Sequence, residues 1–258
     1  MPEINDPELG TPRENRVMYA IQQTGSRLIG DQFIASYLID YIDIAEDSIL
    51  TKRKNNAGKR NSKHPSSQME DNIKKLKEIK SEDYHRVNVL AFFSLWSAHE
   101  SGIENIIAAA LGSIQKAAIA AAAKFKSTQY AELPWPWCDQ ICLEVAQKLD
   151  QKAKNDMPES DRGWDIAARL KKIFLWLGVE IEIPTESAAS LNEASMVRNV
   201  LLHRYGRLGP RDIERAPHLV ESDNKAIKIT RPRLRQYSDA VRVVNVSIMN
   251  GVAKAGWA

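Results

Sequence analysis

Apolar residues recur every three or four positions along most of this chain, which is the period of an amphipathic helix. The longest stretch of this kind covers residues 84–125, where Phe93 and Trp96 belong to one apolar seam. Its second half is rich in alanine, which would let a neighbouring helix approach closely. Residues 31–50 show the same period. The pattern therefore predicts an all-α fold built from long helices.

Capping and helix-breaking residues divide the rest of the chain into further helices. A capping box with proline in the first turn opens a short helix at Thr11, which should stop near Gly25. Ser67 opens another helix by the same logic. The remaining helices are expected at about residues 138–154 and 163–177, from Pro184 to Gly206, and at 234–253.

Two basic stretches interrupt the helical pattern. Residues 51–66 have no apolar period and carry a run of lysines and arginines, so we expect a flexible basic loop there. Residues 207–233 form a basic insertion in which turn-forming residues at 222–225 suggest a small β-hairpin before the last helix. We therefore expect a single helical domain over residues 1–258, with residues 1–30 as an N-terminal extension.

Composition narrows the class of protein. The chain has 258 residues, of which 43% are hydrophobic, enough for a sizeable core in one large domain. Its formal net charge is only +3, so any nucleic-acid footprint must be local. The acidic, polar N-terminus is unlike a signal peptide, and no apolar run approaches the roughly 20 residues that a membrane span needs. These features predict a cytoplasmic protein with no membrane partner.

Metal and cofactor motifs are missing from the sequence. Cys138 and Cys142 could share a metal only with two further ligands, and no CxxC or paired-histidine motif supplies them. We expect two reduced, partly buried thiols, as in a reducing cytoplasm. Glu82 and His85 have the spacing of helical di-iron sites, but such sites need two copies of that motif. We therefore expect no metal and no cofactor.

The residues from Arg198 to His203 are the strongest candidates for catalysis in this sequence. They place a permanent cation, an amide and an imidazole within little more than one helical turn. On a helix, Asn192, Ser195, Asn199 and His203 form one polar stripe, with Arg198 at its border. A stripe of amides, hydroxyl and imidazole favours a lined groove over a solvated face. The alternative is a helix terminus whose cations merely complement the helix dipole.

This motif resembles the HEPN superfamily (higher eukaryotes and prokaryotes nucleotide-binding), whose members carry Arg, a polar residue and His at the end of a helix in an all-helical domain. The match is Arg198, Asn199 and His203, followed by Arg204-Tyr205-Gly206. The resemblance implies a HEPN-like bundle that acts on RNA as a metal-independent endoribonuclease and works as a homodimer. It assigns catalysis to Arg198 and His203 and a supporting role to Asn199. It also implies a bacterial toxin or anti-phage effector restrained by an antitoxin or regulatory protein.

The chemistry of these residue types is consistent with that activity. Attack of a ribose 2′-hydroxyl on the adjacent phosphate needs a base, an acid and positive charge near the phosphoryl oxygens. One histidine from each of two subunits could supply the base and the acid, and arginine could supply the charge. We expect products with 2′,3′-cyclic phosphate and 5′-hydroxyl ends.

Glu100 is expected to support the motif from another helix. It continues the apolar seam four positions after Trp96, and buried carboxylates are nearly always paired. We expect Glu100 to contact Arg198 and orient it. The alternative places Glu100 at the edge of the seam, in water. Its neighbour His99 has the features of an ordinary helix-face histidine.

Other residues are expected to bind the RNA backbone, because phosphate contacts come mainly from lysine and arginine. The candidates are Arg204, Arg207, Arg211, Lys52, Arg53 and Lys54. Two functions from other classes stay open. One is a non-catalytic helical RNA-binding module, and the other is a protein-interaction module with no role in nucleic-acid binding.

Overall fold

The computed structural model describes residues 16–57, 67–125, 129–220 and 226–257, and this part of the chain is helical with no β-strand. The predicted all-α class is therefore confirmed. The helices are α1 (Arg16–Ala57), α2 (Ser67–Ser81), α3 (His85–Ser113), α4 (Gln115–Ala122), α5 (Asp139–Asn155), α6 (Ile166–Trp176), α7 (Thr185–Arg204), α8 (Pro210–Arg215) and α9 (Arg231–Lys254), with a 3-10 turn at Pro217–Leu219.

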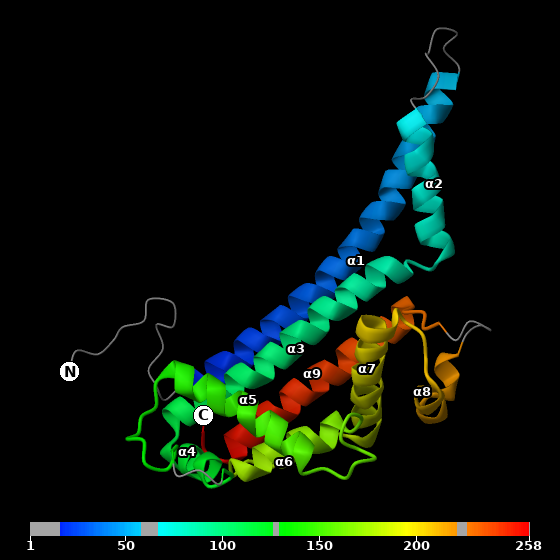
Figure 1. The fold of residues 1–258 in the computed structure, drawn as a ribbon. Coiled ribbons are helices and arrows are strands. Elements are labelled where there is room, and N and C mark those ends of the chain that lie inside the picture. The colour runs from blue at the N-terminus through cyan, green and yellow to red at the C-terminus, as the bar shows by residue number, and fades with distance from the viewer. Residues whose placement is uncertain (1–15, 58–66, 126–128, 221–225, 258) are drawn as a thin grey trace.

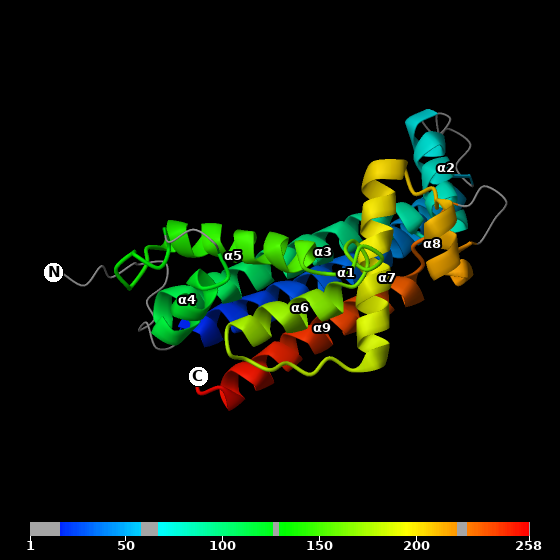
Figure 2. The same ribbon diagram turned by 60° about the horizontal axis from the view of Figure 1, so that its bottom comes forward.

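Helices α1 and α3 run side by side and form the spine of the molecule (Figure 1). Helix α9 packs along this pair, α5 packs against α3, and α7 crosses α9 steeply (Figures 1 and 2). The far half of α1 extends beyond this bundle beside α2 and forms an arm. At 42 residues, α1 is about 63 Å long.

The core forms around α3, which is apolar on most of its circumference. Phe92, Ile106 and Leu111 of this helix are fully buried, as is Tyr237 of α9. Gly102 allows α1 to come close, because a Cβ atom there would lie 2.3 Å from the Cγ2 atom of Thr24. Of the two residues named for the predicted apolar seam, Trp96 is buried and Phe93 is only partly buried.

The predicted single helix over residues 84–125 is wrong. Helix α3 ends at Ser113, Ile114 is extended, and α4 leaves at 109° to α3. The bend buries four alanines of α4, which a straight helix would carry beyond the bundle. The indole of Trp135 donates a hydrogen bond of 3.1 Å to the carbonyl of Leu111 at the end of α3. Periodicity could not reveal this bend, because alanine suits either path.

The predicted boundaries of the first helix are also wrong. Helix α1 continues through Gly25 and Gly30 to Ala57, so residues 51–57 are helical rather than part of a loop. Buried side chains of α1 include Val17 and Ile21, so residues 16–30 belong to the core and not to an extension. A glycine in a helix costs about 1 kcal/mol, which packing against α3 offsets here. Residues 1–15 and 58–66 lie outside the described residues.

The predicted β-hairpin is not confirmed. Pro217–Leu219 forms a 3-10 turn, and the turn residues 221–225 lie outside the described residues. The extended segment after them lies along α3, where Asn88 Nδ2 donates to the carbonyl of Ile229 (2.9 Å) and the Ile229 N–H donates to His85 Nδ1 (2.9 Å). In the described part of the chain, the β-sheet pairing of this segment is limited to one isolated antiparallel bridge between Arg207 and Ala226. Side chains of a helix therefore hold this segment where a partner strand was expected.

Among the described residues, no single helix is long and apolar enough to cross a membrane. Helices α3 and α4 reach that length and composition only as a pair bent by 109°.

The burial of His99 predicts a loss of stability in mild acid. His99 is 3% exposed, and its ring packs against Trp96. Burial, assisted by the nearby Arg169 guanidinium, lowers the pKa of His99 from 6.5 to about 4. Between those values only the unfolded chain binds the proton, so stability falls as pH falls. The free energy of unfolding is expected to drop by about 2 kcal/mol between pH 7 and pH 5. Urea denaturation at pH 7 and at pH 5 measures this difference in the free energy of unfolding.

His99→Gln provides the matched control for this titration, because glutamine is polar but does not ionise in this range. The difference in stability between pH 7 and pH 5 should shrink by most of its value in this variant. An unchanged pH dependence would show that another group is responsible.

Candidate active site

The motif lies in the second half of α7, which begins after Pro184 and ends at Arg204 as predicted. Arg198 Nη2 lies 3.3 Å from Glu100 Oε2 on α3, and Arg198 Nη1 donates to Asn199 Oδ1 at 3.1 Å. Two neighbours thus hold the guanidinium, and the Arg198 side chain is 30% exposed. The expected contact between Glu100 and Arg198 is therefore present.

Glu100 does not lie in the buried seam. Its side chain is 46% exposed, so it combines the predicted contact with the alternative position at the edge of the seam. An ion pair this exposed contributes about 0–1 kcal/mol to stability. The geometry therefore suits orientation of Arg198 better than stabilisation of the fold.

His203 lies in the last turn of α7 and is exposed. Along an ideal helix it lies about 7.5 Å beyond Arg198 and about 140° around the axis from it. The two side chains therefore leave the helix in different directions. The solvent-facing imidazole of His203 is accessible to an RNA strand. Arg198 and His203 of one α7 helix, however, do not point toward the same phosphate.

The first half of the predicted polar stripe is not a groove. Asn192 is buried, where its Oδ1 accepts from the N–H of Ala167 (3.1 Å) and its Nδ2 donates to Asp165 Oδ1 (3.0 Å). It therefore holds the beginning of α6 against α7. Ser195 is also buried, so its hydroxyl is not open to a substrate. The expected supporting role of Ser195 is corrected to packing, because its side chain is buried.

The predicted RNA-binding residues fall into two separate regions. Arg204, Arg207 and Arg211 are exposed just beyond the motif, and Arg204 is paired with Asp212. Lys52, Arg53 and Lys54 belong to the last turns of α1, at the far end of the arm from α7 (Figure 1). The positions of these three side chains lie outside the described part. Only the first region is close to His203.

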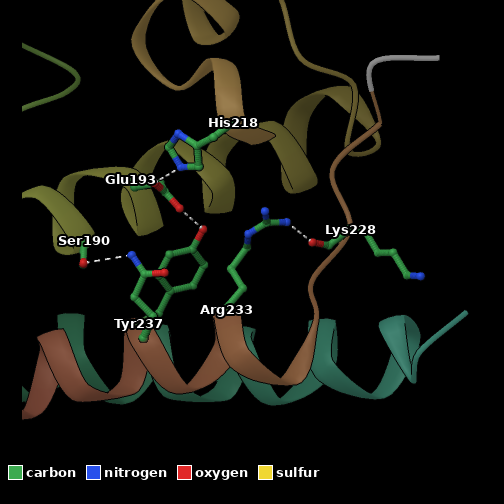
Figure 3. Close-up of polar contacts among 7 residues, drawn as sticks. Ser190, Glu193, His218, Lys228, Arg233 and Tyr237 are labelled. Atoms are coloured by element: carbon green, nitrogen blue, oxygen red, sulfur yellow. Dashed lines mark hydrogen bonds and ion pairs between the residues drawn. The ribbon is translucent and has the colours of Figure 1, made fainter. Parts of the chain in front are cut away.

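A polar cluster around the buried Glu193, which the sequence analysis missed, lies on another face of α7 (Figure 3). Glu193 Oε1 accepts from the Tyr237 hydroxyl of α9 (2.7 Å), and Glu193 Oε2 lies 2.7 Å from His218 Nε2. Burial, together with the adjacent carboxylate, raises the pKa of Tyr237 strongly. The cluster ties the 3-10 turn to α7 and α9, so its geometry is that of a structural clamp.

A signal for this cluster was present in the sequence. Glu193 stands four and seven positions before the apolar Val197 and Val200, which are buried. The spacing that singled out Glu100 therefore applies equally to Glu193.

The remaining candidates have structural contacts. Cys138 is exposed and Cys142 buried, both are free thiols, and burial raises the pKa of Cys142 to about 11. His85 is bonded to the backbone of Ile229. Trp137 is buried in the core. Within the described residues, no group of three or more His, Cys, Asp or Glu is placed to hold a metal ion.

Comparison with models of known protein families, with curated proteins and with solved structures gives no match. The function of the site therefore rests on the chemistry and geometry of its own residues.

Proposed function

We propose that this protein is a metal-independent endoribonuclease of the HEPN type. The observation that carries the proposal is the second half of α7, where Glu100 and Asn199 hold a partly exposed Arg198 while His203 faces solvent one and a half turns later. An oriented guanidinium matches phosphate, and an accessible imidazole can transfer protons. The resemblance of the motif to HEPN proteins supports the same activity.

In the proposed reaction, one His203 removes the proton of a ribose 2′-hydroxyl, whose oxygen attacks the adjacent phosphorus. The bond from phosphorus to the 5′-oxygen breaks, and that oxygen takes a proton from a second, protonated His203. Arg198 stabilises the charge on the phosphoryl oxygens. The products are a 2′,3′-cyclic phosphate and a 5′-hydroxyl, and no step needs a metal.

The reaction requires two copies of the chain. One imidazole performs one proton transfer at a time, and Arg198 and His203 of one α7 point in different directions. In a two-fold homodimer, the motif of each protomer would complete the site of the other. The proposed biological role is that of a bacterial toxin or anti-phage effector held in check by an antitoxin or regulatory protein, as the resemblance suggests.

The test is cleavage of single-stranded RNA by the purified full-length chain in excess EDTA. We expect cleavage, with new 5′ ends that a polynucleotide kinase labels without prior phosphatase treatment, and a homodimer by light scattering. Cleavage that depends on added metal and leaves 5′-phosphate would contradict the proposal. Salt-sensitive binding without cleavage would indicate a non-catalytic RNA-binding module. No binding at all would indicate a protein-interaction module.

A further inference from the structure

The turn that ends α7 contains a tyrosine in a backbone conformation that favours glycine. Tyr205 has φ 53° and ψ 36°, in the left-handed region, which aromatic residues rarely adopt. The N–H groups of Tyr205 and Gly206 both donate to the carbonyl of Val200 at the end of the helix, the second at 3.1 Å. Glycine is the usual residue at the position of Tyr205 in such a turn. Backbone preference therefore does not explain this tyrosine.

Packing does not explain it either. The Tyr205 side chain is 94% exposed, the highest value among the exposed large hydrophobic side chains of the described residues. Tyr84 offers an internal comparison, because it is also left-handed with φ 57°. Its hydroxyl donates to Asp43, and the Arg231 guanidinium lies 4.7 Å from the centre of its ring. Tyr84 is thus anchored by its contacts with other helices, whereas Tyr205 projects into solvent.

The backbone around Tyr205 is held on both sides. The N–H of Arg207 donates to the carbonyl of Arg204 (3.0 Å), and the N–H of Ile227 donates to the carbonyl of Gly206 (2.9 Å). The ion pair of Arg204 with Asp212 ties the turn to α8. These contacts hold the backbone from which the Tyr205 side chain extends into solvent.

The surroundings of Tyr205 favour a polyanion. His203 is exposed two residues before it, and Arg204, Arg207 and Arg211 are exposed around the same turn. Proteins bind unpaired nucleotides by stacking aromatic rings on bases while cations contact the backbone. A protein partner would also accept an exposed tyrosine, but it would have to bring negative charge to these arginines.

We propose that Tyr205 is a stacking platform for an unpaired base of single-stranded RNA, next to the phosphate that His203 acts on. This inference rests on the proposed function and adds a recognition residue to it. Because a duplex hides the faces of its bases, the platform selects single strands over double-stranded RNA.

Binding is tested on full-length His203→Ala, which separates affinity from cleavage. A second change, Tyr205→Gly, is expected to weaken binding of a short single-stranded RNA about ten-fold and to leave double-stranded RNA unaffected. Tyr205→Phe keeps the ring and should bind as His203→Ala alone does. Stacking should also quench a 2-aminopurine in the RNA, and Tyr205→Gly should abolish the quenching.

Stability provides the matched control, because glycine suits the left-handed turn. Tyr205→Gly should melt at the same temperature as its parent or higher, so weaker binding cannot be ascribed to unfolding. Equal affinity of the glycine and tyrosine forms would overturn the inference. So would loss of the homodimer together with RNA affinity in Tyr205→Gly, which would place the tyrosine in a protein interface.

The two proposals fail in different ways. If the wild type cleaves RNA and Tyr205→Gly binds RNA normally, the platform is wrong and the ribonuclease stands. If binding depends on Tyr205 but the wild type never cleaves, the ribonuclease is wrong, and Tyr205 is a stacking platform with no reacting phosphate beside it. If the wild type binds no RNA, both are wrong.

Discussion

Replacing His203 with alanine is expected to lower the rate of RNA cleavage by about 100- to 10,000-fold, because positioned proton transfer contributes a factor of that size. The side chain is exposed, so the melting temperature should stay within the small range typical of surface changes. Single-turnover cleavage in EDTA measures the rate. His218→Gln is the matched control, since it removes another exposed imidazole outside the site, keeps a hydrogen-bond donor for Glu193 and should cleave normally.

Arg198→Ala is expected to lower the same rate by about 100- to 1,000-fold, as removal of one charge-stabilising donor does in other enzymes. Glu100→Gln should lower it less, because glutamine can still accept a hydrogen bond from Arg198 but carries no charge. Arg242→Ala is the matched control, as Arg242 is exposed on α9 and paired with Asp239. Equal losses in Arg198→Ala and Arg242→Ala would point to general charge rather than a site.

Glu193→Ala is expected to lower the free energy of unfolding by about 3 kcal/mol. The variant leaves the Tyr237 hydroxyl without its acceptor in a fully buried site, which costs about 1–3 kcal/mol. The lost side chain leaves a cavity between α7 and α9, which adds to that cost. The connection of the 3-10 turn to α7 through His218 is lost as well. Urea denaturation at pH 7 measures the change.

Glu159→Ala is the matched control for Glu193→Ala, because Glu159 is exposed on a loop and its loss should change stability by less than about 0.5 kcal/mol. Tyr237→Phe keeps the ring but removes the hydroxyl, so its loss in the free energy of unfolding should lie between those of Glu193→Ala and Glu159→Ala. If Glu193→Ala unfolds at the same urea concentration as Glu159→Ala, the cluster does not stabilise the fold.

The helical elements that the sequence predicted best are those whose ends carry strong local signals. Proline before α7, and glycine after it, mark boundaries that the structure confirms. The errors in α1 and α3 have the opposite cause. Gly25 was a reasonable stop by propensity, but continuous contact with α3 outweighs its cost, and Ile114 carries no signal for the bend that buries the alanines of α4.

In the candidate site, too, the sequence predicted the positions of some residues and not of others. The apolar period placed Glu100 in the buried seam, where it does not lie, but the expected contact of Glu100 with Arg198 is present. The period alone could not separate Asn192, which caps α6, from the exposed His203 on the same side of α7. That difference depends on which neighbouring elements cover each turn of the helix.

By itself, the sequence determined the helical class of this protein and the helix that carries the motif, because periodicity and capping are local properties. Only the tertiary structure decided where α3 bends, which polar residues of α7 are buried, and that Tyr205 faces solvent from a left-handed turn. These features depend on contacts between segments far apart in the chain, and a local sequence pattern does not predict such contacts.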